Sequence, residues 1–298
     1  MALPLALAAL LTGSPVAAGS KTFVSRIRVE MVQDRDVAKM VSLGGTCNRC
    51  ELSGRNLTGA TFTGATFMNA TLVGADLRGA ELVGSNFTGS DFTRANMRGV
   101  EIVGANFTSA IFDNAALAGA EAQGASFVRA NLSNADLSSA ELHGVNFNGA
   151  TLTHANLASS ELFGATLANV RAAGANFSNA EIQAANMTSG DFSGASFRNT
   201  ELDGARLTNG RFNRADFSDA SLRRTDIRGA DLSGARGLTQ DQIDETCGDG
   251  STRLPRALTV NTCRSSRIVR VAPAPPAPPP PPPPPPPVRR NFLTVMDN

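Results

Sequence analysis

The residues most able to bind a metal or form a covalent link are four cysteines, two near each end of the repetitive part of the chain. Cys47 and Cys50 form a Cys-x-x-Cys pair, and Cys247 and Cys263 stand further apart near the other end. Four cysteines can in principle hold one Zn²⁺ ion. In an oxidising compartment, a Cys247–Cys263 disulfide would instead stabilise the fold by about 3 kcal/mol. Cys47 and Cys50 can also form a disulfide with each other, or remain as thiols in a segment that caps the start of the repeats.

A second group with chemical potential is a series of glutamates that recur at every twentieth position. Carboxylates at a fixed spacing can attract a basic partner or loosely held cations, although duplication of one sequence unit also explains them. We favour duplication, and keep the series as the candidate binding column of the protein. Its seven members are Glu81, Glu101, Glu121, Glu141, Glu161, Glu181 and Glu201.

The two histidines give no support for an active site. His143 follows Glu141, but no serine or cysteine nucleophile comes in register with the pair, and His154 belongs to a different position of the repeat. The sequence has no Gly-rich phosphate loop and no histidine cluster at metal spacing. We therefore expect a protein that is not an enzyme and that holds no catalytic residues, cofactor or metal.

The elements that must position these residues follow a repeat of five. From Leu52 to Leu232, the second position of each five is filled 37 times, by 17 Leu, 13 Phe, 3 Ile, 2 Met and 2 Ala. The two alanines are Ala122 and Ala172, where we expect the core to be locally thin. Two residues before each of these positions, 25 of the 37 sites are Ala. A helix needs apolar residues every 3.6 positions and a strand every 2.0, so the pattern indicates a coil that turns a corner about every five residues.

A second period, four times as long, gives the number of sides. The glutamates and the five phenylalanines from Phe67 to Phe147 both recur at this spacing, which equals four fives. The Ala-[Asp/Asn]-[Leu/Phe]-x-x pattern, as in 75–79 and 130–134, resembles the pentapeptide-repeat family. That resemblance implies a right-handed quadrilateral β-helix. We expect an all-β, right-handed, four-sided parallel β-helix solenoid of about nine coils, roughly 45 Å long.

A rod of this length separates the two cysteine pairs. One zinc site shared by all four is therefore excluded, and we favour a Cys247–Cys263 disulfide over free thiols. For Cys47 and Cys50 we favour a structural role, because a redox motif needs a thioredoxin-like context that the sequence lacks.

The ends of the chain differ in composition from the repeats. Leu3 to Leu11 is apolar and is followed by small residues, as in a secretory signal, although no Lys or Arg precedes it. Near the other end, Thr239 and Gln242 form a capping box that predicts a short helix, and 257–260 predicts a strand. The expected segments are a signal peptide (1–18), an N-terminal cap (19–50), the solenoid (51–235), a C-terminal cap with the helix, the strand and the cysteine pair (236–265), and a disordered Pro-rich tail (266–298).

These features predict an exported, periplasmic or secreted scaffold that presents flat polar faces to an unknown protein partner. We expect no transmembrane segment after removal of the signal peptide. The sequence also allows the rods to associate end to end. The polyproline tract at 278–287 is either a stiff tether or a tail without a partner. Some members of the family mimic DNA and bind topoisomerase, so a cytosolic DNA mimic is the alternative. One glutamate column is much sparser than the charges of a duplex, and arginines crowd the last coils, so neither this role nor nucleic-acid binding is favoured.

Overall fold

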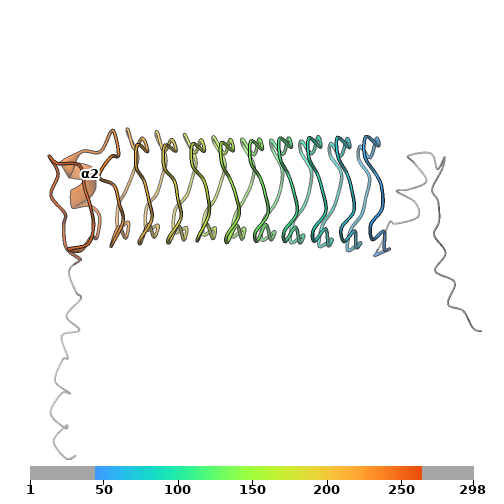
Figure 1. Cartoon of the computed structure of the whole chain (residues 1–298), viewed down its shortest axis with the longest axis horizontal. Coiled ribbons are helices and arrows are strands. Elements are labelled where there is room, and N and C mark those ends of the chain that lie inside the picture. Colours follow the sequence, from blue (N-terminus) through green and yellow to red (C-terminus); the bar gives the residue numbers. More distant parts are fainter. Residues whose placement is uncertain (1–43, 264–298) are drawn as a thin grey trace, which may run out of the picture.

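The fold is a rod, seen in a computed structural model that describes residues 44–263 (Figure 1). The predicted signal peptide, the N-terminal cap up to residue 43 and the chain from residue 264 onward lie outside the described residues. Within the described range, the first coil and the C-terminal cap lie at opposite ends of the rod.

Successive coils pair in parallel, one bridged residue per side. Glu51 pairs with Thr71 and Thr71 pairs with Asp91, each step advancing by four repeats of five. The Leu52 N–H donates to the Thr71 carbonyl at 2.7 Å, and the Thr71 N–H donates to the Cys50 carbonyl at 2.8 Å. Bridged positions recur at every fifth residue, which gives four sides to each coil. The parallel four-sided arrangement predicted from the two periods is confirmed, and the pairing begins one repeat earlier than expected, at Thr46.

The corners explain the residue types of the repeat. At one corner the Arg55 N–H donates to the Leu52 carbonyl, and Gly54 has a φ of 65°, as in a type II turn. This left-handed conformation favours Gly or Asn at the fourth place of each five. Asp or Asn at the bridged position accepts the N–H of the residue two places on, as Asp91 does from Thr93 at 2.8 Å.

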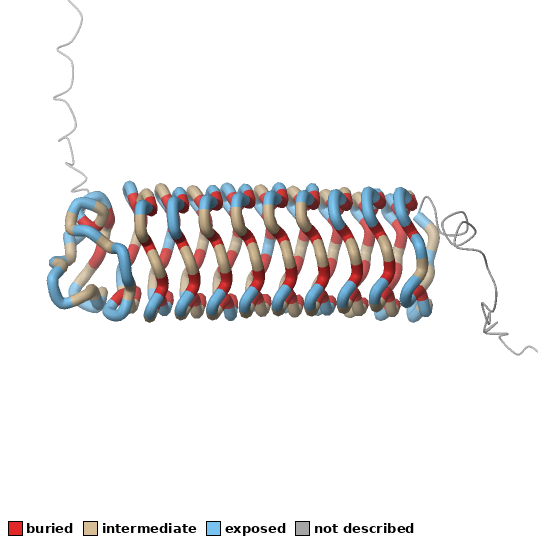
Figure 2. The backbone as a smooth tube through the Cα atoms, turned by 90° about the horizontal axis from the view of Figure 1, so that it is seen from above, coloured by how far each residue is buried: buried red, intermediate tan, exposed pale blue. Residues whose placement is uncertain are grey.

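The inward positions form one continuous core along the rod (Figure 2). All 13 phenylalanines on the inward phase are buried. The five phenylalanines that recur from Phe67 to Phe147 stack on one another, with ring centroids 4.7–5.5 Å apart between neighbours. Ala122 and Ala172 are also fully buried, so the small side chains open no path from the core to solvent at these two positions.

A short helix closes part of the last coil. Helix α2 (Gln240–Asp244) begins after Thr239, whose hydroxyl accepts the Gln242 N–H in the predicted capping box. The Gln242 side-chain amide donates to the carbonyls of Phe217 and Ala220 at 3.1 and 2.8 Å. These carbonyls belong to the coil beneath, so α2 caps backbone groups that a further coil would otherwise pair.

The strand predicted at 257–260 is wrong. Residues 256 and 257 lie in a turn, and the paired residue of this stretch is Thr262, which bridges to Gly248. The reason is that the Gln240 side chain takes both backbone groups of Thr259, accepting its N–H at 3.0 Å and donating to its carbonyl at 3.1 Å. Because the Gln240 side chain holds both its N–H and its carbonyl, Thr259 has no backbone group left to pair with a neighbouring strand.

Candidate functional site

The structure places the seven glutamates on one side of the rod. Each is bridged to the next, from Glu81↔Glu101 to Glu181↔Glu201. Six of the side chains are exposed and Glu101 is partly exposed. Because the parallel coils lie about 4.8 Å apart, the carboxylates form a continuous ladder of like charge. We call these residues the glutamate column.

A second column runs beside the first, at the positions two residues after each glutamate. From this companion column, three side chains reach the glutamate of the next coil. The Gln123 amide donates to Glu141, the His143 Nε2 lies 2.8 Å from the Glu161 Oε2, and Gln183 donates to Glu201 at 2.6 Å. The companion column comprises Val83, Val103, Gln123, His143, Phe163, Gln183 and Asp203.

Phe163 is the most exposed large hydrophobic residue among those described, at 56%. It lies in the companion column between Glu161 and Glu181 in sequence. Sequence analysis did not single it out, although a signal was present: it is the one phenylalanine within 51–235 that falls off the inward phase. The face therefore combines negative charge with an exposed aromatic ring.

Arginine side chains pair with some carboxylates of the described rod and not with others. Five aspartates elsewhere in the described part form ion pairs with arginines, whereas no glutamate of the column pairs with Lys or Arg there. The Arg78 side chain, for example, hydrogen-bonds Asp76 and lowers the pKa of that carboxyl below its ordinary value. The five pairs are Asp76–Arg78, Asp203–Arg223, Asp216–Arg198, Asp226–Arg228 and Asp231–Arg253.

Neutralising the middle of the column should not weaken the fold. We expect the triple variant Glu121→Gln, Glu141→Gln, Glu161→Gln to unfold at the same denaturant concentration as the wild type or at a higher one. Adjacent carboxylates repel by about 1 kcal/mol in water before salt screening, and glutamine still accepts the bonds from Gln123 and His143. A clear loss of stability in chemical denaturation would instead indicate a stabilising network that uses the charges.

Aspartates that cap turns should make the fold sensitive to acid. Asp249 accepts the hydroxyls of Ser251 and Thr252 at 2.6 and 3.2 Å and the N–H groups of Ser251 and Gly229, which lower its pKa from 3.8 to about 2. A depressed pKa contributes stability that is complete above the unfolded value and is lost as the pH falls through the folded one. We expect wild-type unfolding free energy to fall from pH 4 to pH 2, and less steeply in Asp249→Asn. Equal slopes in denaturant titrations at these pH values would contradict this assignment.

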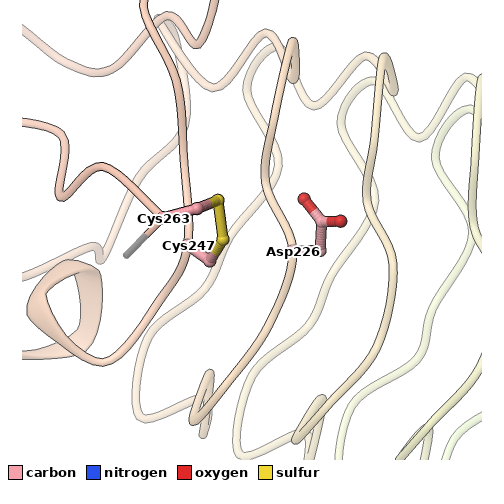
Figure 3. A group of neighbouring side chains, drawn as sticks. All are labelled: Asp226, Cys247 and Cys263. Carbon is pink, nitrogen blue, oxygen red and sulfur yellow. A yellow bond between two sulfur atoms is a disulfide. The ribbon is translucent and has the colours of Figure 1, made fainter. Parts of the chain in front are cut away.

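Both cysteine pairs are joined as disulfides, and no free cysteine remains among residues 44–263. The Cα atoms of Cys47 and Cys50 lie 5.4 Å apart, and those of Cys247 and Cys263 lie 4.5 Å apart. Asp226 lies beside the second pair, with ligand-type atoms within 4.8 Å of one another (Figure 3). The two sulfurs are already bonded to each other, and both Asp226 oxygens accept hydrogen bonds from Arg228. We therefore assign this cluster a structural role in the C-terminal cap.

A hollow lies where α2 meets the last regular coil. It has a volume of about 630 Å³ and is lined by Ser218, Asp219, Ala220, Gly237, Thr239 and Gln242. Asp219 is its one charged side chain, and no nucleophile with a base beside it lines this hollow. No helix of the described residues is long and apolar enough to cross a membrane.

The repeat itself decides the family. A model described as "Pentapeptide repeats" matches eight copies between residues 47 and 236, over 47–82, 72–108, 110–149, 130–162, 160–199 and 200–236. The chain belongs to the pentapeptide-repeat family. This confirms the resemblance predicted from the sequence. No curated protein matches the chain in sequence.

Solved pentapeptide-repeat structures resemble this one. HetL from the cyanobacterium Nostoc sp. strain PCC 7120, described as involved in heterocyst differentiation regulation, is 25% identical with a TM-score of 0.53. The match covers 74% of this chain and 97% of HetL. QnrB1, a plasmid-mediated fluoroquinolone resistance protein, is 20% identical with a TM-score of 0.30, over 70% of this chain and 89% of QnrB1. The likeness to HetL supports the pentapeptide-repeat fold.

Proposed function

We propose that this pentapeptide-repeat protein is an exported, non-enzymatic scaffold that binds a protein partner through a flat side of its rod. The observation that carries the proposal is the glutamate column itself, a ladder of seven carboxylates on one side of the rod, none of which forms an ion pair with Lys or Arg in the described part. Such a surface favours a partner with a basic face, since complementary charge speeds association and selects among partners. We infer a right-handed coil of about nine layers over 51–235, with four repeats to a layer.

Export is supported by two features of the chain. The first is the predicted signal peptide at 1–18, which lies outside the described residues. The second is the pair of disulfides, Cys47–Cys50 and Cys247–Cys263, since disulfides persist mainly in oxidising compartments. A fusion of residues 1–20 to a reporter that is active only outside the cytoplasm should be active. An inactive fusion would leave the cytosolic DNA-mimic alternative.

A flat, regular rod supports binding better than catalysis. Catalysis needs polar groups that converge in a pocket, whereas each side of the coil repeats the same outward positions in every layer at fixed spacing. The single column also carries fewer charges than duplex DNA, which has one charge every ~1.7 Å along its axis. Binding to a basic protein surface therefore fits this face better than DNA mimicry.

Capture from an extracytoplasmic extract tests the proposed binding. The mature chain, residues 19–298, should retain a protein with a basic surface at low salt and release it as ionic strength rises. A parallel capture with residues 272–298 removed identifies partners of the Pro-rich tail. The proposal would be wrong if nothing is retained, or if every retained protein depends on the tail.

A further inference from the structure

We propose that two copies of this chain pair in antiparallel orientation, through the side of the rod opposite the glutamate column. The contact is made by charges of alternating sign at the bridged positions of that side, here called the alternating ladder. This goes beyond the scaffold function, because the pair presents two glutamate columns that face in opposite directions. A partner with two basic sites can bind such a pair more tightly than a single rod. The alternating ladder comprises Arg171, Asp191, Arg211, Asp231 and Arg253.

The alternating ladder and the glutamate column lie on opposite sides of the coil. Asp191 follows Glu181 by two repeats of five, which is two of the four sides. Helix α2 follows Arg236 and precedes Cys247, so it continues the side of the glutamate column and not the side of the ladder. A second rod can therefore approach the ladder without contacting the glutamates or the helix.

Duplication of one coil does not explain the order of charges in the ladder. Copying repeats one residue type at every twentieth position, as in the glutamate column. In the ladder the sign of the charge instead changes at each step, from Arg171 to Asp191 and again to Arg211. Neither of the two remaining sides has five successive charges at its bridged positions in the described part. The alternation therefore needs an explanation other than copying.

Within one chain the ladder is only partly used. Arg171, Asp191 and Arg211 form no ion pair among the described residues. The Asp191 carboxylate is nevertheless held in place, because its Oδ1 accepts the Ser193 N–H at 3.0 Å and the Ser193 hydroxyl at 2.6 Å. Its Oδ2 receives no hydrogen bond in the described part, and both arginines are exposed. An oriented acceptor and two exposed donors are thus left for a contact outside the chain.

The order of charges is its own complement when it is reversed. A two-fold axis between the coils of Asp191 and Arg211 places the ladder of one copy, reversed, against the ladder of the other. Asp191 then meets Arg211 of the second copy, and Arg171 meets Asp231 of the second copy. The axis generates each pair twice, and both ladders have the same spacing of about 4.8 Å, so all the pairs are in register. The glutamate column would instead oppose carboxylate to carboxylate in an antiparallel pair.

The side is flat enough for this approach. At each end of the overlap, Arg253 meets Thr151 of the second copy, so no like charges oppose each other between the two ladders. From Thr151 to Arg253 the overlap covers six coils, about 29 Å of rod. A contact of this size fits a reversible dimer rather than an obligate one. The column two residues after the ladder adds only short side chains, those of Thr153, Ala173, Ser193, Asn213 and Ser233.

Sedimentation equilibrium of the mature chain, residues 19–298, tests this dimer over a wide range of protein concentration. We expect the wild type to form dimers as the concentration rises. In the variant Asp191→Arg, arginines of the two copies oppose each other beside the axis, so the dissociation constant should rise about tenfold or more. The double variant Asp191→Arg, Arg211→Asp has opposite charges at every pair again, and should restore the dimer.

Asp136→Arg is the matched control, and should dimerise like the wild type. Asp136 accepts the N–H and the hydroxyl of Ser138, as Asp191 does from Ser193, but it lies on a neighbouring side of the coil. A chain that stays monomeric at every concentration would overturn the proposal. So would a dimer that Asp191→Arg does not weaken, or that the double variant does not restore. No partner protein is used and the glutamate column is unchanged throughout, so the result is independent of the capture test.

Discussion

Replacing Phe107 with alanine should lower the unfolding free energy by about 3–5 kcal/mol. Phe107 is fully buried and stacks between Phe87 and Phe127, with ring centroids 5.5 and 5.1 Å away. Phe92 and Phe112 also meet its edge or face at 5.7 and 5.3 Å. Truncation leaves a cavity in the middle of the rod, which the neighbouring coils cannot close without breaking their own ladders.

Chemical denaturation followed by circular dichroism measures this loss, and Phe163→Ala is the matched control. It removes the same side chain from the companion column, where the ring is 56% exposed, so we expect a change within about 0.5 kcal/mol. Similar losses in the two variants would contradict the division of the repeat into inward and outward positions.

Removing the Cys247–Cys263 disulfide should also destabilise the fold strongly. We expect the double variant Cys247→Ser, Cys263→Ser to have an unfolding free energy about 3 kcal/mol lower than the wild type. The disulfide joins positions separated by 16 in the sequence and holds the end of the described chain against the last coil. Without the disulfide the unfolded chain has more conformational entropy, and the end of the cap is held less firmly against the backbone of the last coil. In a solenoid, a weakened end frays before the middle.

Hydrogen exchange of the wild type and the double variant locates this loss. Exchange should speed up mainly from residue 222 to the end of the cap, and much less near Phe107. The variant Cys47→Ser, Cys50→Ser is the control: its disulfide joins positions separated by only 3 in the sequence, so it restricts the unfolded chain far less. Uniform acceleration along the rod, or an equal loss of stability in both variants, would contradict this role of the C-terminal disulfide.

The period of the sequence was enough to predict the sides of the coil. Once Leu52 and Phe107 are placed on the same inward phase, every glutamate of the column follows on one outward side, as the bridges from Glu81 to Glu201 show. This succeeds because each coil repeats the same backbone, so position in the repeat fixes direction. The capping box at Thr239 was also readable, since it depends on two residues close together in the sequence.

Contacts between different coils were not readable in the same way. Gln183 reaches Glu201 from the coil before, and Gln240 holds the backbone of Thr259, which is distant in the sequence. Each depends on the rotamer of a long side chain rather than on the period. The strand predicted at 257–260 failed for this reason: local composition favoured a strand, while a distant side chain took the hydrogen bonds that a strand needs.

Comparison of two charge-matched variants tests most directly whether the glutamate column is the binding face. Affinity for the captured partner would be measured by calorimetry for the wild type, for Glu121→Gln, Glu141→Gln, Glu161→Gln, and for Glu51→Gln, Asp113→Asn, Asp219→Asn, which removes three carboxylates from other parts of the rod. We predict a loss of about tenfold or more for the first variant and wild-type affinity for the second. Equal affinities in all three proteins, or a loss confined to the second variant, would contradict the account.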